Sequence, residues 1–180
     1  MSAYSATIIL GSAITNVIRS ETVMNLPRTL LLLIPCFFLC FASCDSPPIS
    51  DPVINVDETN ESMNEAIETA KSTFHHFLDN WETMPNATSS VKFGVPTSDD
   101  SLEHIWFEPI KITDTEITGI CGNEPARVPG LKLGDMRTFK RSEMSDWMIL
   151  DESNCYGGYT IRVLVEMEPE NAPPFKFVDF

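Results

Sequence analysis

The chain has 180 residues, of which 26 are Asp or Glu and 12 are Lys or Arg, so its formal net charge at pH 7 is −14. An acidic surface repels nucleic-acid phosphates and anionic lipid head groups, and the only adjacent basic residues are Lys140 and Arg141. The composition therefore excludes nucleic acid as a partner.

The first recognisable element is an apolar segment near the N-terminus. Leu30–Ala42 reads LLLLIPCFFLCFA, which is shorter than the about 20 residues of a membrane-spanning helix and is interrupted by Pro35. A short apolar run that follows a basic residue, here Arg28, and precedes small residues is typical of a signal peptide. We predict a signal peptide over residues 1–43, with Met24 as an alternative start. A buried core helix or an uncleaved anchor are the competing interpretations.

The apolar segment ends at a cysteine. Phe41–Cys44 reads FASC and resembles a bacterial lipobox, in which small residues precede a cysteine that is lipidated and becomes the new N-terminus; Phe41 departs from the commoner leucine. Two or more acyl chains hold a protein stably on a membrane. We predict a lipoprotein anchored through Cys44 at the periplasmic face of the bacterial envelope, with a secreted protein cleaved nearby as the alternative. Residues 44–61, rich in Pro, Asp and Ser, are predicted to be a flexible linker.

The remaining residues, 62–180, are predicted to form a single domain that begins with a helix. Ser62 and Glu65 fit a capping box. The apolar residues that follow recur every three or four positions and predict an amphipathic helix ending before Met84 and Pro85, with a stripe formed by Met63, Ala66, Ile67, Ala70, Phe74, Phe77, Leu78 and Trp81. Such a helix needs a sheet to cover its apolar face.

The sheet is predicted from alternating apolar residues. Five segments are expected to be strands: Val91–Val95, Glu103–Ile112 (with an edge or bulge at Pro109), Thr115–Cys121, Leu131–Phe139 and Trp147–Leu150. Ser142–Asp146 is expected to be a turn, and Tyr159–Met167 fits a strand or a helix, with its β-branched residues favouring a strand. We predict an α+β fold in which one amphipathic helix packs on a small, mostly antiparallel sheet.

Two cysteines remain beyond the predicted leader and lipidation site. In an oxidising compartment, Cys121 and Cys155 are expected to form a disulfide. Two buried free thiols or one reactive cysteine are the alternatives. Cys121 could act as a nucleophile with His104 as its base.

The candidate binding residues are aromatic and charged. Trp147 could form the floor of a pocket in which Asp146 orients a ligand, or the two could be a core residue and a turn cap. Arg162 could bind an anion or form an ion pair with Asp146 or Glu103. His104, which we expect at the surface, and Trp106 complete the set.

Metal and cofactor signatures are weak. His75 and His76 are adjacent on the predicted helix, so their side chains point about 100° apart and are poorly placed to share a metal ion. The sequence contains neither HExxH nor a glycine-rich phosphate loop. We expect no metal site and no cofactor.

Four motifs occur in order along the predicted domain. They are EHIWFEPI (Glu103–Ile110), GICGNEP (Gly119–Pro125), MSDWMIL (Met144–Leu150) and GGYTIR (Gly157–Arg162). Together they resemble the YegJ-like family of bacterial proteins of unknown function. The resemblance implies a small α+β domain, often in exported or lipid-anchored proteins, and it supplies no catalytic residues.

Two functions are consistent with these features. The first is a noncatalytic domain at the cell envelope that binds a protein, a peptide or a wall component. The second is a small hydrolase or transferase that uses Cys121 or Asp146 with His104.

Overall fold

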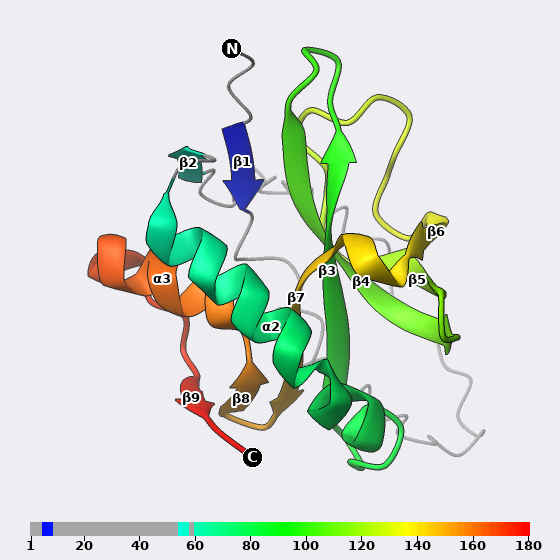
Figure 1. Cartoon of the computed structure of the whole chain (residues 1–180), viewed down its shortest axis with the longest axis vertical. Coiled ribbons are helices and arrows are strands. Elements are labelled where there is room, and N and C mark those ends of the chain that lie inside the picture. Colours follow the sequence, from blue (N-terminus) through cyan, green and yellow to red (C-terminus); the bar gives the residue numbers. More distant parts are fainter. Residues whose placement is uncertain (1–4, 9–53, 58–59) are drawn as a thin grey trace, which may run out of the picture.

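The computed structural model describes residues 5–8, 54–57 and 60–180 (Figure 1). No helix among these residues is both long and apolar enough to cross a membrane. In chain order the elements are β1 (Ser5–Ile8), β2 (Ile54–Asp57), α2 (Glu61–Asn80), β3 (Thr88–Pro96), β4 (Leu102–Ile112), β5 (Glu116–Cys121), β6 (Met136–Lys140), the 3-10 helix η2 (Arg141–Glu143), β7 (Met144–Asp151), β8 (Asn154–Gly157), α3 (Tyr159–Met167), the 3-10 helix η3 (Pro169–Asn171) and β9 (Lys176–Val178).

The nine strands of the described residues form one sheet. Its order is β2-β1-β4-β3-β7-β8-β9, and β5 pairs with both β4 and β6. Most pairs are antiparallel, whereas β1–β4 and β8–β9 are parallel. The α+β class is therefore right, but the prediction of one helix on a small sheet is wrong. Strands of three or four residues, such as β8 and β9, carry too few alternating positions to be recognised in a sequence.

The predicted export signals lie mostly outside the described residues, and Cys44 and Leu30–Ala42 are among those not described. Strand β1 lies within the predicted signal peptide, and β2 lies within the predicted linker. Cleavage before Cys44 would separate β1 from its partners β2 and β4.

Helix α2 crosses one face of the sheet, as Figure 1 shows. Its N-cap is Asn60, whose side-chain oxygen accepts a hydrogen bond from the Met63 amide at 2.9 Å. The predicted capping box at Ser62 is therefore displaced, because Asn60 is also a strong N-cap residue and starts the helix earlier. The predicted stripe is confirmed, since Ala70, Phe74 and Phe77 are buried against the sheet.

The central strands agree with the predicted pattern. Strands β3, β4 and β5 cover the first three predicted segments, and the register shift between Pro109 and Lys111 is the expected bulge. The fourth segment is a strand only from Met136, because Gly134, with φ of +87°, interrupts the extended conformation before it. The predicted strand Trp147–Leu150 lies within β7, and β7 also includes Asp146, which was predicted to end the preceding turn.

The last predicted strand is a helix. Tyr159–Met167 forms α3, although its residues also alternate as a strand would. Gly157 and Gly158 both have positive φ, of +75° and +62°, and they turn the chain away from the sheet before the helix begins. The preference for a strand at this segment was therefore wrong.

The two faces of the sheet carry separate apolar cores. The core under α2 includes Phe93, Phe107, Cys121 and Trp147. The opposite face carries a second cluster that includes Trp106, Met148, Leu150, Cys155 and Ile161 of α3. Cys121 and Cys155 are consequently in different cores, and both are free. The predicted disulfide is wrong because the sheet separates its two thiols.

Candidate functional site

Two of the predicted site residues, Trp106 and Asp146, belong to a row of polar and aromatic side chains across the sheet. In the register of the strands, Lys92 of β3 is opposite Trp106 of β4 on one side and Asp146 of β7 on the other. Directly paired residues share a face of the sheet, so these side chains gather on the face away from α2. Lys92 and Asp146 are fully buried, which is rare for charged residues.

Asp146 is held by backbone and hydroxyl donors. One carboxylate oxygen accepts hydrogen bonds from the amides of Trp147 (2.8 Å) and Tyr159 (3.2 Å), and the other accepts from the amide (2.8 Å) and hydroxyl (2.5 Å) of Thr160. Two of these amides belong to the first turn of α3, which has no side-chain cap from the adjacent Gly158. Asp146 therefore caps α3 from a strand.

Lys92 completes this cluster through Thr160. Its ammonium group donates to the Thr160 hydroxyl at 2.5 Å and lies 4.5 Å from the centroid of the Trp106 ring. Burial lowers the pKa of Lys92 from 10.5 to about 8, while the negative charge of Asp146 acts in the opposite direction. Burial raises the pKa of Asp146 above 3.8, against the opposing effects of Lys92 and the hydrogen bonds. The polar groups of this cluster satisfy one another.

His104 lies beside the cluster and is half-buried, although we expected it at the surface. Its Nδ1 is 2.9 Å from the Ser145 hydroxyl, which is also 3.3 Å from the Lys92 carbonyl oxygen. Burial lowers the pKa of His104 from 6.5 to about 4, and the positive charge of Lys92 adds to this effect. The imidazole is therefore neutral at pH 7.

The other predicted site residues lie elsewhere. Trp147 is on the α2 side of the sheet, where its Nε1 donates to the Ala70 carbonyl at 2.9 Å. Arg162 forms an ion pair with Asp179 at 3.1 Å and donates to the Gly157 carbonyl at 3.2 Å. These contacts connect α3 to the segment around β9 and include neither of the carboxylates that we expected Arg162 to pair with.

The predicted partner of Arg162 on β4 has a different role. Glu103 is fully buried, and its two carboxylate oxygens accept from the amides of Ala126 and Arg127, both at 2.7 Å. The segment between β5 and β6 is thereby attached to β4.

Cys121 and His104 do not form a nucleophile–base pair. Cys121 is opposite Phe107 in the β4–β5 register, and Phe107 and His104 are separated by an odd number of positions on β4, so the thiol and the imidazole lie on opposite faces. The Cys121 thiol donates to the Asn123 carbonyl at 3.1 Å. Burial raises the pKa of Cys121 to about 11, which disfavours the reactive thiolate.

The open surface of the domain is hollowed between α2 and the β4–β5 turn. A cavity of about 720 Å³ lies here, and this volume is within the range of about 300–1,000 Å³ expected for ligand pockets. It is lined by Lys71, Phe74, Asp114, Thr115, Glu116, Lys140, Arg141, Ser142 and Met144. A second cavity of about 400 Å³ shares Asp114 and Arg141 with the first and continues toward Trp81 and Ile110. We call the two adjoining cavities the α2 groove.

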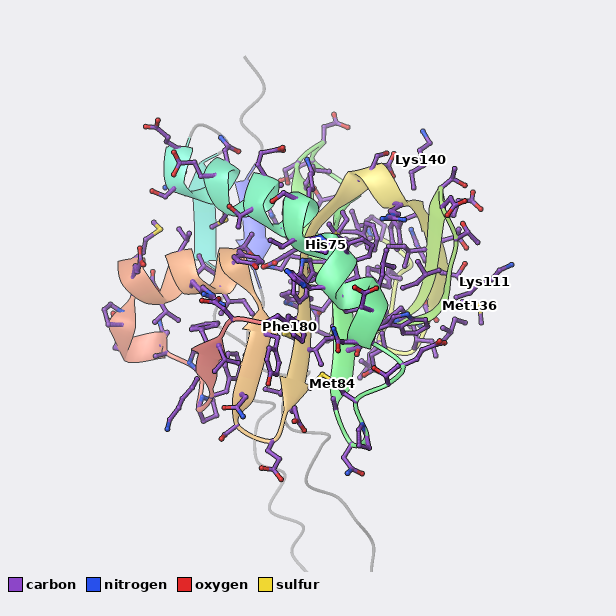
Figure 2. The ribbon with its side chains drawn as sticks, turned by 60° about the horizontal axis from the view of Figure 1, so that its bottom comes forward. His75, Met84, Lys111, Met136, Lys140 and Phe180 are labelled. Atoms are coloured by element: carbon purple, nitrogen blue, oxygen red, sulfur yellow. The ribbon has the colours of Figure 1, made fainter. Side chains whose placement is uncertain are left out.

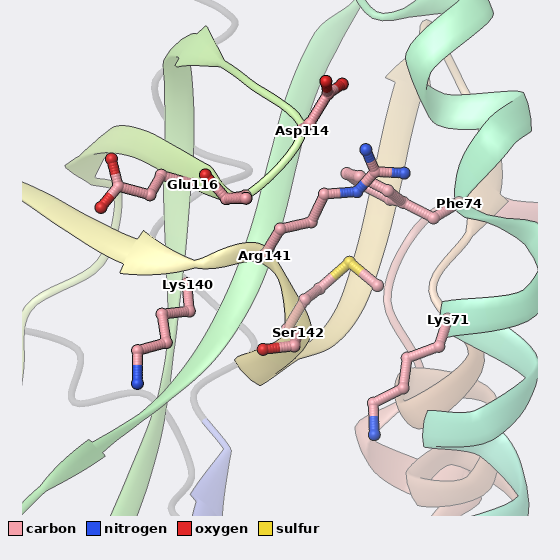
Figure 3. Close-up of a pocket in the computed structure, with 9 residues that line it drawn as sticks. Lys71, Phe74, Asp114, Glu116, Lys140, Arg141 and Ser142 are labelled. Atoms are coloured by element: carbon pink, nitrogen blue, oxygen red, sulfur yellow. The ribbon is translucent and has the colours of Figure 1, made fainter.

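Arg141 lies at the junction of the two cavities. Its amide donates to the Thr115 carbonyl at 2.8 Å, and its guanidinium lies 5.0 Å from the centroid of the Phe74 ring. Figure 3 shows the guanidinium next to Phe74 and below Asp114, with Lys71 and Lys140 on opposite walls. Among the described residues, no carboxylate lies within 4.0 Å of the Arg141 guanidinium.

Sequence reasoning missed Lys92, Thr160 and Arg141. Lys92 lies between Val91 and Phe93 in a regular alternation of apolar and polar residues. This pattern predicts that Lys92 faces solvent, unless the face of the sheet on which it lies is known to be covered. In the sequence, Arg141 is distinguished only as one of two adjacent basic residues. The signal available for Arg141 was its position at the end of a predicted strand, where side chains commonly line binding sites.

Within residues 5–8, 54–57 and 60–180, no group of three or more His, Cys, Asp or Glu side chains is arranged to hold a metal ion. The rings of His75 and His76 lie with their centroids 4.1 Å apart, and the ring of His76 stacks on Phe180 at 5.4 Å. In Figure 2, His75 and Phe180 lie on the α2 side of the sheet, whereas Lys111, Met136 and Lys140 lie around β5 and β6.

Comparisons with known proteins place the domain in a family. The chain is 25% identical over 143 residues to the uncharacterized protein YegJ of Escherichia coli (strain K12), covering 79% of this chain and 92% of that protein. It is 29% identical over 118 residues to a putative ankyrin repeat protein, NMB1133/NMB1171, of Neisseria meningitidis serogroup B (strain ATCC BAA-335 / MC58), covering 61% of this chain and 47% of that protein. No solved structure matches the chain. Residues 60–176 match the family described as "Uncharacterized protein conserved in bacteria (DUF2314)", and the chain therefore belongs to this YegJ-like family of bacterial proteins of unknown function.

Proposed function

We propose that the chain is an exported bacterial protein, anchored by lipid on Cys44, whose domain binds a partner at the cell envelope without transforming it. The observation that carries the binding role is the α2 groove, whose larger cavity has a volume of about 720 Å³ and whose Arg141 has no carboxylate within 4.0 Å among the described residues. The apolar leader and the lipobox-like sequence before Cys44 support the location.

The arrangement of the titratable groups favours binding over catalysis. The polar groups of the buried Lys92 and Asp146 side chains are hydrogen-bonded to Thr160 and to backbone amides. A group that acts on a substrate needs a free lone pair or proton directed at the substrate, and Asp146 already accepts four hydrogen bonds. Cys121 and His104 lie on opposite faces of the sheet. We therefore retain the envelope protein, peptide or wall component of the first hypothesis as the class of partner.

His104 remains a candidate contributor to binding because it is half-buried beside the cluster on the face opposite α2, whereas Trp106 is only 2% exposed and belongs to the core. His104 does not line the α2 groove. A contribution from His104 would therefore involve a separate surface, and its substitution should not alter binding in the groove.

The experiment that tests the location is the intact mass of protein extracted from bacterial membranes. We expect a chain that begins at Cys44 and carries the added mass of a diacylglycerol with or without a further acyl chain. A Cys44→Ser variant serves as the control and should lack this mass. Protein that retains residues 1–43 and carries no acyl group in the wild-type chain would overturn the proposed anchor.

A further inference from the structure

The charge distribution in the α2 groove indicates the chemistry of its ligand. The chain as a whole carries more than twice as many acidic as basic residues, yet Lys71, Lys140 and Arg141 line one cavity from α2, β6 and η2, beside Asp114 and Glu116. The lining therefore has three cations against two carboxylates, so an anionic group is repelled less here than over the rest of this acidic protein. This grouping is not visible in the sequence, because Lys71 is far from the other two cations along the chain.

Arg141 is the residue best prepared to bind an anion. Its backbone is attached to the β4–β5 turn through Thr115, and its guanidinium is oriented by the ring of Phe74, so little side-chain entropy remains to be lost on binding. A guanidinium presents two parallel N–H donors that match a carboxylate. Because no described carboxylate is within 4.0 Å, these donors are available to a ligand.

The two lysines can support the same anion. Lys71 pairs with Glu68 one turn away at 2.9 Å, and Lys140 pairs with Glu143 at 3.7 Å. All four side chains of these pairs are well exposed, and exposed ion pairs of this kind contribute about 0–1 kcal/mol. In Figure 3 both ammonium groups point away from the Arg141 guanidinium, but because their ion pairs are weak, either lysine can turn toward a bound anion at little cost in free energy.

One wall of the groove is negative. Asp114 lies above the Arg141 guanidinium in Figure 3 and lines both cavities. A polyanion such as a polyphosphate would be repelled by Asp114, whereas a ligand with one carboxylate and one amine would place opposite charges against both residues. Phe74 and Met144 line the floor of the groove but are almost fully buried, so the charged groups contribute most of the recognition.

We infer that the α2 groove binds a short peptide whose carboxylate pairs with Arg141 and whose amine pairs with Asp114. This inference rests on the proposed binding function and names its ligand. The peptide lies between α2 and the β4–β5 turn, with its carboxylate at the Arg141 guanidinium and its amine at Asp114.

The test uses the full-length chain and three acetylated tripeptides. The first has a central lysine between two alanines and a free C-terminal carboxylate, so that it has one anion and one amine. The second is its C-terminal amide, which lacks the anion. The third has norleucine in place of lysine, which removes the amine and keeps the apolar chain. Binding is followed by titration of backbone amide signals in NMR spectra, with Thr115 and Ser142 as reporters within the groove.

We expect the free acid to shift the reporter signals and the amide to bind at least about tenfold more weakly, as the loss of one charge-assisted interaction predicts. An Arg141→Ala variant should bind the free acid about tenfold more weakly and should no longer distinguish the acid from the amide. An Asp114→Asn variant should no longer distinguish lysine from norleucine. A Lys176→Ala variant, which removes an exposed cation on β9, is the matched control and should bind like the wild type.

Equal binding of the acid and the amide, or equal effects of the Arg141 and Lys176 substitutions, would overturn the inference. The absence of any shift with millimolar free acid would overturn the ligand class while leaving the lipid anchor intact. Failure of the anchor is detected separately, by the mass of the membrane-extracted protein. An Arg141→Lys variant keeps the charge, so a loss of binding in this variant would support bidentate recognition by the guanidinium.

Discussion

The buried opposite charges of Lys92 and Asp146, connected through the Thr160 hydroxyl, allow a quantitative prediction about stability. A Lys92→Met substitution keeps a long side chain beside Trp106 and removes the ammonium group. The Asp146 carboxylate is then buried without a cation, but it can take up a proton instead. Protonating an Asp of pKa 3.8 at pH 7 requires about 4 kcal/mol, which sets the upper limit of the penalty. Because its hydrogen bonds remain, we expect a loss of about 2–3 kcal/mol.

An Asp146→Asn substitution should have a larger effect. Each carboxylate oxygen accepts two hydrogen bonds, and an amide NH2 group in place of one oxygen accepts none. Two donors are left without an acceptor, at about 1–3 kcal/mol for each buried group, and Lys92 loses its counter-charge. We expect a loss of about 3–5 kcal/mol, with the first turn of α3 affected most.

The double variant tests whether the two residues act together. Once Lys92 is absent, the Asp146→Asn substitution no longer leaves a buried cation unpaired, so the double variant should be about 2 kcal/mol more stable than the sum of the single effects predicts. Urea unfolding at pH 7, followed by tryptophan fluorescence with the slope of each transition compared, measures all four free energies. Additivity within about 0.5 kcal/mol would refute the coupling through Thr160.

The pH dependence of the same variants provides an independent check. The pKa of Lys92 is about 8 in the folded chain and 10.5 in the unfolded chain, so the unfolded chain binds more protons between these values. The Lys92 contribution to stability therefore rises with pH from about 8 to 10.5, by up to about 3 kcal/mol. The Lys92→Met variant lacks this contribution, and an identical pH dependence in both proteins would contradict the assignment.

Three further predictions concern single sites. The pKa of His104 is about 4 in the folded chain and 6.5 in the unfolded chain, so the free energy of unfolding should fall by up to about 3 kcal/mol as the pH drops through this interval. A His104→Gln variant should not show this fall when urea unfolding is compared at pH 7 and pH 4.5. The same pH dependence in the variant and the wild type would contradict this prediction. Burial raises the pKa of Cys121 to about 11 and the pKa of Cys155 to about 12. An aromatic disulfide reagent at pH 8 should therefore label the folded chain far more slowly than the urea-unfolded chain. Rapid labelling of the folded chain would show that the thiols are accessible. A Gly157→Ala substitution would place a Cβ atom 2.3 Å from the Trp147 carbonyl oxygen. It should destabilise the folded chain by at least about 2 kcal/mol more than Gly134→Ala, where φ is also positive but no atom lies within 4 Å of the added Cβ. Equal thermal stabilities of the two variants would argue against this geometry.

Periodicity predicted the elements whose two faces differ most strongly. The stripe of α2 and the alternation in β3, β4 and β5 were recognisable because one side of each element meets a deep core. The position of Lys92 was misleading for the same reason. Alternation shows that two faces are different, but it does not show that α3 and Trp106 bury the second face.

The helix α3 illustrates the limit of local sequence information. Its residues satisfy the periods of a strand and of a helix, so the choice depends on what surrounds them. The glycines before it turn the chain out of the sheet, and Asp146, which precedes them on β7, supplies the acceptors for its first amides. The effect of these glycines and of the Asp146 cap on α3 cannot be predicted until the pairing of β7 and β8 is known.

The same two-faced sheet explains why the groove, and not the polar cluster, is the better candidate for recognition. Asp146 and Lys92 hold the first turn of α3 through Tyr159 and Thr160, so any ligand that drew them away would also release the cap of that helix. Arg141 has no such structural duty among the described residues beyond its backbone bond to Thr115 and its contact with Phe74. A ligand can therefore bind Arg141 without competing with the fold. Substitutions at Lys92 or Asp146 should accordingly change unfolding free energy before they change binding, whereas substitution of Arg141 should change binding at nearly constant stability.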